Sequence, residues 1–208
     1  VLPVLGLFER ADGTGRLPHF DAHELAEALA LAKPGNVSMD KGTIRFNRSG
    51  MGLTLDGIAK GYIADAASAM LAARGIDNHM VNAGGDIRVS TAPGQRPWQI
   101  GIRHPGRPDT LLASLALSRG GIATSGSYEK NFDRSGSRHH LISHVSGRSP
   151  DIRSVSVWAR SAMEADALAT ALSLMPPAEA LRHVEATTSA ACLIIDRHGR
   201  RYASPGWS

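Results

Sequence analysis

The segment from Ser161 to Leu174 constrains the fold most, because it carries a helix start, a run of helix formers and a stop signal. Ser161 and Glu164 have the spacing of a capping box. Alanine, leucine and methionine fill the turns that follow, and a Pro-Pro pair at 176–177 ends them. The sequence therefore predicts a helix over 161–174.

Asp166 and Thr170 lie four residues apart on this predicted helix and therefore share one face. A carboxylate and a hydroxyl one turn apart are hard oxygen ligands, which suit Mg²⁺ or Ca²⁺ and not a soft metal. An ordinary helix with a polar stripe carries the same pattern. The neighbouring residues are small or apolar, so a buried Asp166 would need a partner, either a cation or a basic side chain from elsewhere in the chain.

Composition predicts a globular protein, because 42% of the 208 residues are hydrophobic and 20% are charged. The net charge of +4 mildly favours anionic ligands such as nucleotides, whereas nucleic acid is not expected because no basic stripe is interleaved with aromatic residues. The single cysteine, Cys192, excludes an intrachain disulfide and a cysteine-based metal cluster. The sequence has no apolar run long enough to predict a transmembrane segment, and no signal peptide or lipid-attachment cysteine is visible near Val1.

The remaining pattern predicts alternating helices and strands, without an internal repeat or a clear second domain boundary. Residues 1–20 are predicted as a loop. Helices are expected at 21–32, from about 57 to 73 and at 178–185, and strands at 37–40, 43–46, 51–55, 79–82, 86–89, 98–103, 111–117, 155–159, 191–195 and 202–203.

Two glycine-containing segments are candidates for ligand contact. Lys60 stands between Gly57 and Gly61 at a predicted helix start, where a phosphate would be favoured, although a solvated lysine is the alternative. The glycine spacing is not that of a Walker A loop. A second segment, with Gly84 and Gly85 between Asn82 and Asp86, is interpreted as a turn that is either ordinary or ligand-facing.

Residues 120–128 are rich in small side chains, and their hydroxyl and backbone N–H groups suit a phosphate or a flavin edge. The candidate contacts there are Thr124, Ser125 and Gly126, and a plain loop would have the same composition.

Three histidines, His139, His140 and His144, follow shortly afterwards. The surrounding glycines and serines argue against a helical zinc site, so a single catalytic histidine or a surface cluster is expected instead.

Six blocks occur in an order and spacing that resemble the ApbE flavin transferases. Each block is weak alone, but the six together are specific and the match covers roughly residues 50 to 205. They are 56–62 with Asp65, 82–87, 98–105, 123–126 with Tyr128, 140–142, and 165–170.

The resemblance implies an α+β fold with mixed, partly antiparallel sheets and packed helices in two closely joined lobes, as one domain over 1–208 that lacks part of the family's N-terminal segment. Members of the family use Mg²⁺ to transfer the FMN half of FAD to a threonine of an acceptor flavoprotein, with release of AMP. By the same resemblance, the location is expected to be periplasmic or membrane-associated. The alternatives are a flavin-binding module without catalysis and a hydrolase that converts FAD to FMN and AMP.

The resemblance also assigns roles to single residues. Asp166, Thr170 and the backbone carbonyl of Gly57 are the implied metal ligands, and His140 is the implied base for the acceptor threonine. Flavin-nucleotide contacts are expected at Lys60, Asn82, Gly84, Gly85, Asp86, Thr124, Ser125 and Gly126. This sequence departs from the family pattern after His140, because Ser143 and His144 stand where an Asp-Pro pair is usual and Ser-Gly at 146–147 replaces Thr-Gly.

Overall fold

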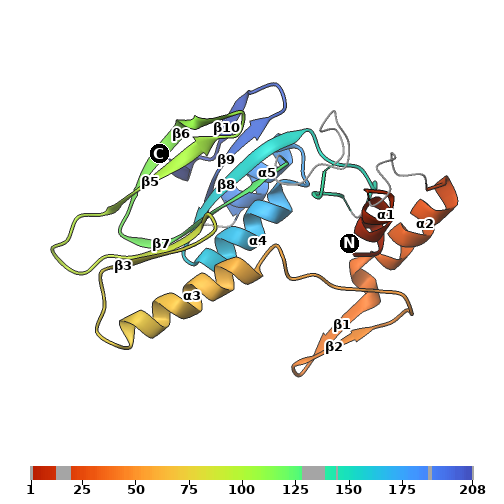
Figure 1. Cartoon of the computed structure of the whole chain (residues 1–208), viewed down its shortest axis with the longest axis horizontal. Coiled ribbons are helices and arrows are strands. Elements are labelled where there is room, and N and C mark those ends of the chain that lie inside the picture. The colour runs from red at the N-terminus through yellow and green to blue at the C-terminus, as the bar shows by residue number, and fades with distance from the viewer. Residues whose placement is uncertain (1, 13–19, 128–138, 144, 187–188, 208) are drawn as a thin grey trace. The chain divides into compact units, whose positions relative to one another are not determined.

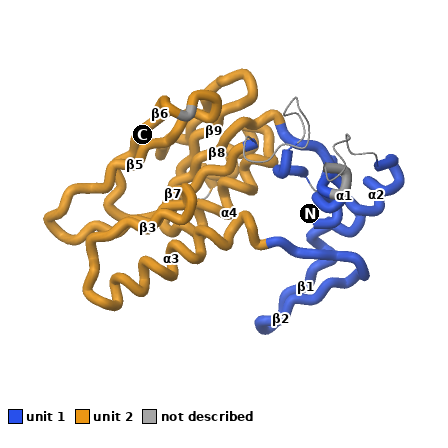
Figure 2. The backbone as a smooth tube through the Cα atoms, viewed as in Figure 1, with its two compact units in different colours: residues 1–54, 127–150 blue, residues 55–126, 151–208 orange. Residues whose placement is uncertain are grey.

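The computed structural model describes residues 2–12, 20–127, 139–143, 145–186 and 189–207. They divide into two compact units (Figure 2). Unit 1 contains residues 1–54 and 127–150, and unit 2 contains residues 55–126 and 151–208. Helices and antiparallel sheets occur together, so the predicted α+β class is confirmed. None of the helices in the described part of the chain is long and apolar enough to cross a membrane.

Unit 1 is built around two helices, α1 (Leu2–Asp12) and α2 (Ala22–Leu31). The prediction of a loop over 1–20 was wrong for residues 2–12. The glycine at position 6 suggested a break, but Val4, Leu7 and Phe8 recur at helical spacing and are buried. They pack with Ala28 and Ile142, and this tertiary packing stabilises the helix.

The start of α2 follows the sequence prediction, because Asp21 and Glu24 form a full capping box. A short 3₁₀ helix, η1 (Pro34–Asn36), leads into a hairpin of β1 (Val37–Asp40) and β2 (Thr43–Phe46). The strand predicted at 51–55 is wrong, since these residues form neither helix nor strand.

Unit 2 has a six-stranded antiparallel sheet in the order β10-β9-β8-β7-β4-β3. A separate two-stranded hairpin is formed by β5 and β6. The strands are β3 (His79–Ala83), β4 (Asp86–Ser90), β5 (Trp98–His104), β6 (Arg107–Leu117), β7 (Arg119–Gly126), β8 (Ile152–Ala159), β9 (Ala191–Asp196) and β10 (Arg201–Ala203).

The six-stranded sheet is covered on both faces (Figure 1). On one face, α3 (Ala59–Ala72) lies against β3 and β4, α4 (Ala162–Leu172) against β7 and β8, and α5 (Pro177–Ala186) against β9. On the other face, the β5–β6 hairpin and Trp207, in the 3₁₀ helix η2 (Pro205–Trp207), pack on inward-facing residues of the central strands. Alternate residues of each strand therefore enter two different cores.

The small residues at 120–126 form part of β7, so the prediction of a loop there was wrong. The small residues serve close packing instead. A Cβ on Gly121 would overlap the backbone of Ala162 at the start of α4. Glycine at this position therefore lets α4 approach the sheet.

Cys192, on β9, lies in the core between the sheet and its helices. Burial raises the pKa of its thiol to about 11, against the opposing effect of hydrogen bonds with Ser204. This thiol is a structural residue, as the sequence predicted, and it is not an activated nucleophile.

Candidate active site

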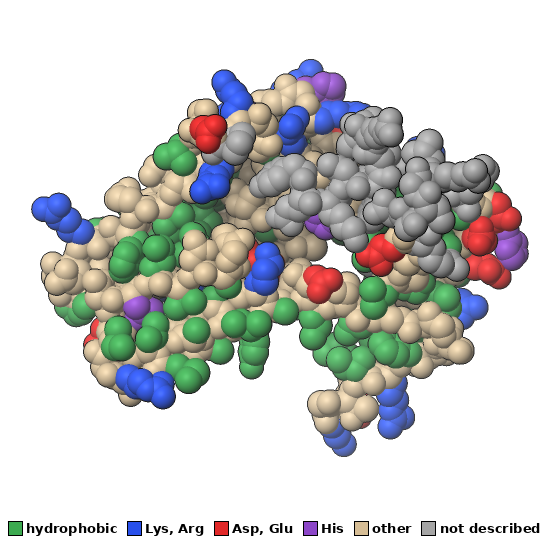
Figure 3. All heavy atoms as spheres, in the orientation of Figure 1, with side chains coloured by type: hydrophobic (Ala, Val, Ile, Leu, Met, Phe, Trp, Pro, Cys, Tyr) green, Lys and Arg blue, Asp and Glu red, His purple; other side chains and the backbone are tan. Residues whose placement is uncertain are grey.

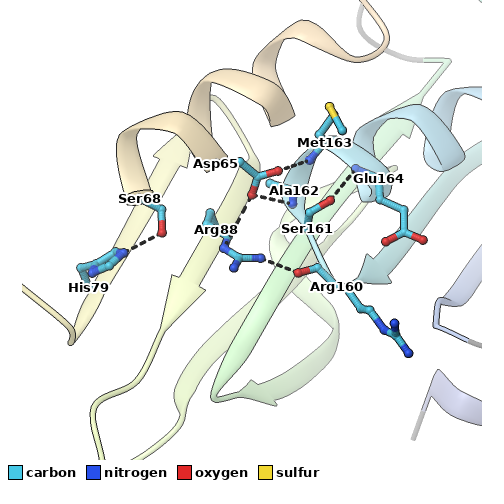
Figure 4. A network of polar contacts seen from close by, with 9 residues as sticks. All are labelled: Asp65, Ser68, His79, Arg88, Arg160, Ser161, Ala162, Met163 and Glu164. Atoms are coloured by element: carbon cyan, nitrogen blue, oxygen red, sulfur yellow. Dashed lines mark hydrogen bonds and ion pairs between the residues drawn. The ribbon is translucent and has the colours of Figure 1, made fainter. Parts of the chain in front are cut away.

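The start of α4 is fixed by three acceptors of backbone N–H groups (Figure 4). Ser161 is the N-cap, and its hydroxyl accepts from the N–H of Glu164 at 3.1 Å. Asp65, which projects from α3, accepts from the N–H groups of Ala162 at 3.0 Å and Met163 at 2.9 Å. A carboxylate at a helix N-terminus also complements the positive end of the helix dipole, so α3 and α4 are joined by electrostatics as well as packing.

Arg88 on β4 connects this helix junction to the sheet (Figure 4). Its Nε lies 3.6 Å from Asp65 Oδ1, and its guanidinium donates to the carbonyl of Arg160, just before α4. Sequence reasoning gave neither Asp65 nor Arg88 a role. Asp65 lay within a recognised block, but its partners are distant along the chain and no local spacing identifies them.

Farther along α3, Ser68 and His79 form a buried pair (Figure 4). The Oγ of Ser68 lies 2.7 Å from Nε2 of His79, whose Nδ1 is 2.6 Å from the carbonyl of Ile76. Because a carbonyl only accepts, Nδ1 carries the proton and Nε2 accepts from the serine. This buried arrangement anchors α3 to β3.

Asp166 is buried on α4, with 4% of its surface exposed. Its Oδ2 accepts a 3.0 Å hydrogen bond from the backbone N–H of Gly61, near the start of α3. A Cβ on Gly61 would overlap the carbonyl of Ala162, so glycine is needed for this approach of the two helices. The sequence predicted a partner for a buried Asp166, and one partner is a backbone amide.

Thr170 lies one turn further along α4, and its Oγ1 is 3.2 Å from Ser125 Oγ on β7. Gly57 also lies beside Thr170, because a Cβ added to it would be 2.9 Å from Thr170 Oγ1. The structure therefore brings all three predicted metal ligands, Gly57, Asp166 and Thr170, to the place where α3 begins beside α4.

This donor set would consist only of oxygen atoms, from a carboxylate, a hydroxyl and a backbone carbonyl. Such donors suit a hard cation, usually with water or substrate oxygens completing the coordination. No group of three or more His, Cys, Asp or Glu side chains suitable for a metal ion is found in the part of the chain that is described. The residues present therefore fit Mg²⁺ or Ca²⁺ and do not fit a zinc site.

Lys60 and Asp86 were predicted separately, and the structure pairs them. Asp86 begins β4 and its side chain is only 3% exposed, whereas that of Lys60 is 47% exposed. Lys60 Nζ lies 2.7 Å from Asp86 Oδ2, and this oxygen has no hydrogen bond of good geometry, so the ion pair compensates its burial. Lys60 is exposed to solvent, as the solvated-lysine alternative expects, and is in addition paired with a buried carboxylate.

The segment before Asp86 is a tight hairpin turn. Gly84 and Gly85 have φ angles of 69° and 109°, and Asn82 Oδ1 accepts from the N–H of Gly85 at 2.8 Å. Positive φ at both central residues is typical of a type I′ hairpin turn, which glycine tolerates best. The turn holds Asp86 at the start of β4, beside Lys60.

Thr124, Ser125 and Gly126 end β7, but their side chains do not share one face. Ser125 lies beside Thr170, on the helix-covered face of the sheet. The Oγ1 of Thr124 instead lies 2.8 Å from Ser156 Oγ on β8, and Gly126 pairs with Ser154. A ligand that contacts Ser125 Oγ would therefore contact the backbone of Thr124 and not its side chain.

His140 belongs to unit 1 and is half-buried. His139 beside it is buried, and its backbone N–H donates to Ser149 Oγ at 3.0 Å. The hydroxyl of Ser143 accepts from the N–H groups of Val145 and Ser146 at 3.2 and 3.4 Å. Ser143 thus stabilises the turn after His140, while His144 lies outside the described residues.

The family model of the ApbE family matches residues 1–194. The chain belongs to the ApbE family. An FAD:protein FMN transferase of Treponema pallidum is 39% identical over 173 residues, which are 73% of this chain and 47% of that protein. A Rhodobacter capsulatus protein of the same name is 34% identical over 87% of this chain and 35% of its own length.

Solved ApbE structures have the same fold. The ApbE protein of Thermotoga maritima matches with a TM-score of 0.84 and 30% identity, over 98% of this chain and 69% of that one. The flavinyl transferase ApbE of Pseudomonas stutzeri matches with a TM-score of 0.82 and 26% identity, over 98% of this chain and 65% of that one. The present chain spans about half the length of the curated ApbE relatives that it matches.

Proposed function

We propose that this chain is a Mg²⁺-dependent FAD:protein FMN transferase, which moves FMN from FAD to a threonine of an acceptor flavoprotein and releases AMP. The observation that carries the proposal is the meeting of Asp166 and Thr170 with the glycine-containing start of α3. The names of the relatives, FAD:protein FMN transferase, supply the reaction class.

Asp166 Oδ, Thr170 Oγ1 and the carbonyl of Gly57 would hold the metal ion. Mg²⁺ bound there would neutralise the negative charge of the pyrophosphate and the charge that develops on the departing AMP. The Asp65 network keeps α4 in place and thereby orients two of the three ligands.

The proposed reaction exchanges one phosphorus–oxygen bond for another. The acceptor threonine oxygen bonds to the phosphorus of the FMN half, while the bond from that phosphorus to the bridging pyrophosphate oxygen breaks. AMP leaves with the bridging oxygen, and His140 takes the threonine proton. Histidine suits this role because its ordinary pKa lies near neutral pH. We further propose that residues 1–208 act as one ApbE-like domain.

The flavin nucleotide would be held along the start of α3 and the adjoining strand ends. The ammonium of Lys60 suits a phosphate group, and its ion pair with Asp86 would restrict its position. The further contacts that we propose are Asn82, Gly84, Gly85, Asp86, Thr124, Ser125 and Gly126, with Thr124 contributing through its backbone.

The experiment that tests the proposal mixes the protein with FAD, MgCl₂ and a threonine-containing acceptor peptide. AMP is measured by chromatography, and covalent FMN on the peptide by mass spectrometry. Asp166→Asn and Thr170→Val should abolish most of both products at low Mg²⁺. His140→Ala should lower transfer about 10²–10⁴-fold with FAD binding nearly unchanged, because a general base contributes a factor of this size. His23→Ala, an exposed histidine of the same unit, is the matched control.

Each result separates one function from the others. AMP with modified peptide supports the transferase. AMP and FMN with unmodified peptide would identify a hydrolase. FAD binding without any AMP would identify a binding module and contradict the proposal.

A further inference from the structure

Six arginines lie along one edge of unit 2, and we call this surface the arginine edge. All six side chains are exposed. Figure 3 shows Lys and Arg side chains gathered along the upper edge of the view, where Figure 1 places β6 and β10. The members are Arg103, Arg107, Arg153, Arg197, Arg200 and Arg201.

Strand pairing makes this surface continuous, although its residues come from separate parts of the chain. Arg201 on β10 pairs with Ile195 on β9, which in turn pairs with Ser154 beside Arg153. The guanidinium of Arg153 reaches the tip of the β5–β6 hairpin, because a Cβ on Gly106 would lie 3.2 Å from it. Arg103 and Arg107 lie at that same tip.

The turn between β9 and β10 is held firmly by Asp196. Its Oδ1 accepts from the backbone N–H groups of His198 at 2.8 Å and Arg200 at 2.9 Å, and Tyr202 donates to Oδ2 at 3.2 Å. The basic side chains are therefore presented from a turn of fixed shape, which lowers the entropy cost of binding a partner.

Acidic side chains only partly neutralise the edge. Asp151 pairs with Arg197 at 2.7 Å, and Asp196 is engaged by the turn that it holds. Asp109, on β6, is exposed nearby. Among the described residues of this edge, six arginines are accompanied by three aspartates, which leaves an excess of positive charge that favours an anionic partner.

The arginine edge is connected by strand pairing to Gly126 at the end of β7. Gly126, one of the proposed flavin contacts, pairs with Ser154 on β8, and the same row continues through Ile195 to Arg201. A partner segment that extended from the end of β7 across β8 and β9 would reach the arginine edge.

We propose that the arginine edge binds an acidic stretch of polypeptide next to the acceptor threonine. This inference rests on the proposed transferase function, which requires a protein acceptor. The planar guanidinium of arginine forms two parallel hydrogen bonds with a carboxylate, and every basic residue other than histidine on this edge is arginine.

Binding is tested directly, without reliance on turnover. Two fluorescein-labelled threonine peptides are compared by anisotropy, one flanked by glutamates and the other by glutamines at the same positions. The acidic peptide should bind at least about 10-fold more tightly, and this preference should shrink when NaCl rises from about 50 to about 500 mM. The double variant Arg200→Glu/Arg201→Glu should lose the preference, whereas Arg45→Glu/Arg48→Glu, with the same charge change in unit 1, should keep it. The milder Arg200→Gln/Arg201→Gln pair replaces the first double variant if thermal melting shows that it is unfolded.

Turnover then distinguishes this inference from the proposed function. If transfer occurs, the Arg200/Arg201 variants should raise KM for the acidic peptide with kcat and FAD affinity unchanged. If the acidic peptide binds at the edge but no AMP or modified peptide forms, the acidic partner is supported and the transferase fails. Equal binding of both peptides overturns the inference. The inference is also overturned if phosphatidylglycerol-containing vesicles bind through the arginine edge while the acidic peptide is not preferred. That result would identify a membrane surface as the partner.

Discussion

The backbone N–H of Gly61 donates to Asp166 Oδ2 over 3.0 Å, although the two residues are 105 positions apart in the chain. This bond joins the start of α3 to α4, where Asp166 is buried. The absence of a side chain at Gly61 allows the approach, because a Cβ would overlap the carbonyl of Ala162. The geometry of the candidate metal ligands therefore depends on a glycine that is not itself a ligand.

Gly61→Ala should destabilise the protein by about 3 kcal/mol, since an added methyl group must displace backbone atoms of α4 instead of a flexible side chain. Urea unfolding followed by circular dichroism measures the change. Gly35→Ala is the matched control, because a Cβ there meets nothing within 4 Å. Equal unfolding midpoints for the two variants would contradict the close packing described at Gly61.

Lys60→Ala should lower the free energy of unfolding by about 1–3 kcal/mol, because it leaves the buried carboxylate of Asp86 without its ammonium partner. The double variant Lys60→Ala/Asp86→Asn should recover part of this loss, since the uncompensated charge is then removed. A double-mutant cycle by urea unfolding gives the coupling energy. Lys33→Ala, at an exposed position, is the control and should change the free energy of unfolding little. If the effects of Lys60→Ala and Asp86→Asn simply add, Lys60 and Asp86 are not coupled.

Local signals were sufficient to predict most of the helices. The cap at Ser161 and the stop at Pro176 give α4 nearly its observed limits, and the capping box of Asp21 and Glu24 gives those of α2. Helix α1 was missed because its stability comes from contacts with α2 and Ile142, which composition does not reveal. Strand β7 was missed because its glycines reflect the approach of α4, a tertiary requirement.

The candidate site was predictable to the extent that its residues share an element. Helical spacing alone predicts that Asp166 and Thr170 share one face of α4, whereas their proposed role as metal ligands comes from the family resemblance. Their contacts with Gly61 and Ser125 depend on how α3, α4 and β7 pack, so they could not be derived from sequence spacing. The same holds for Lys60 and Asp86, which were identified individually and meet only because α3 covers the strands β3 and β4.

Cys192 should be unreactive in the folded protein. Its thiol is fully buried and its pKa is raised to about 11, so very little thiolate exists near pH 8 and reagents cannot reach it. Treatment with a thiol reagent such as DTNB should release about one equivalent only after unfolding in urea. Rapid release from the folded protein, at the rate of a small-molecule thiol, would contradict the buried position of β9.

Asp196 should make the stability of unit 2 depend on acidity. Burial acts to raise the pKa of Asp196, but hydrogen bonds from the N–H groups of Arg200 and His198 and from Tyr202, with the nearby His198, outweigh it and lower the pKa below 3.8. A carboxyl group with a lowered folded-state pKa stabilises the protein above its unfolded-state pKa, and this contribution is lost as the pH falls through the folded-state value.

Asp196→Asn should therefore lower the urea midpoint at about pH 7, and the difference from the parent protein should narrow as the pH falls below 3.8. The asparagine removes the negative charge while it keeps one oxygen for the turn N–H groups. Asp109→Asn, at an exposed position on β6, controls for the change in net charge and should show no such convergence. A difference between Asp196→Asn and the parent that stays constant from about pH 7 to pH 2 would mean that the Asp196 carboxylate does not stabilise the turn through its charge. The arginine edge would then owe its fixed shape to strand pairing alone.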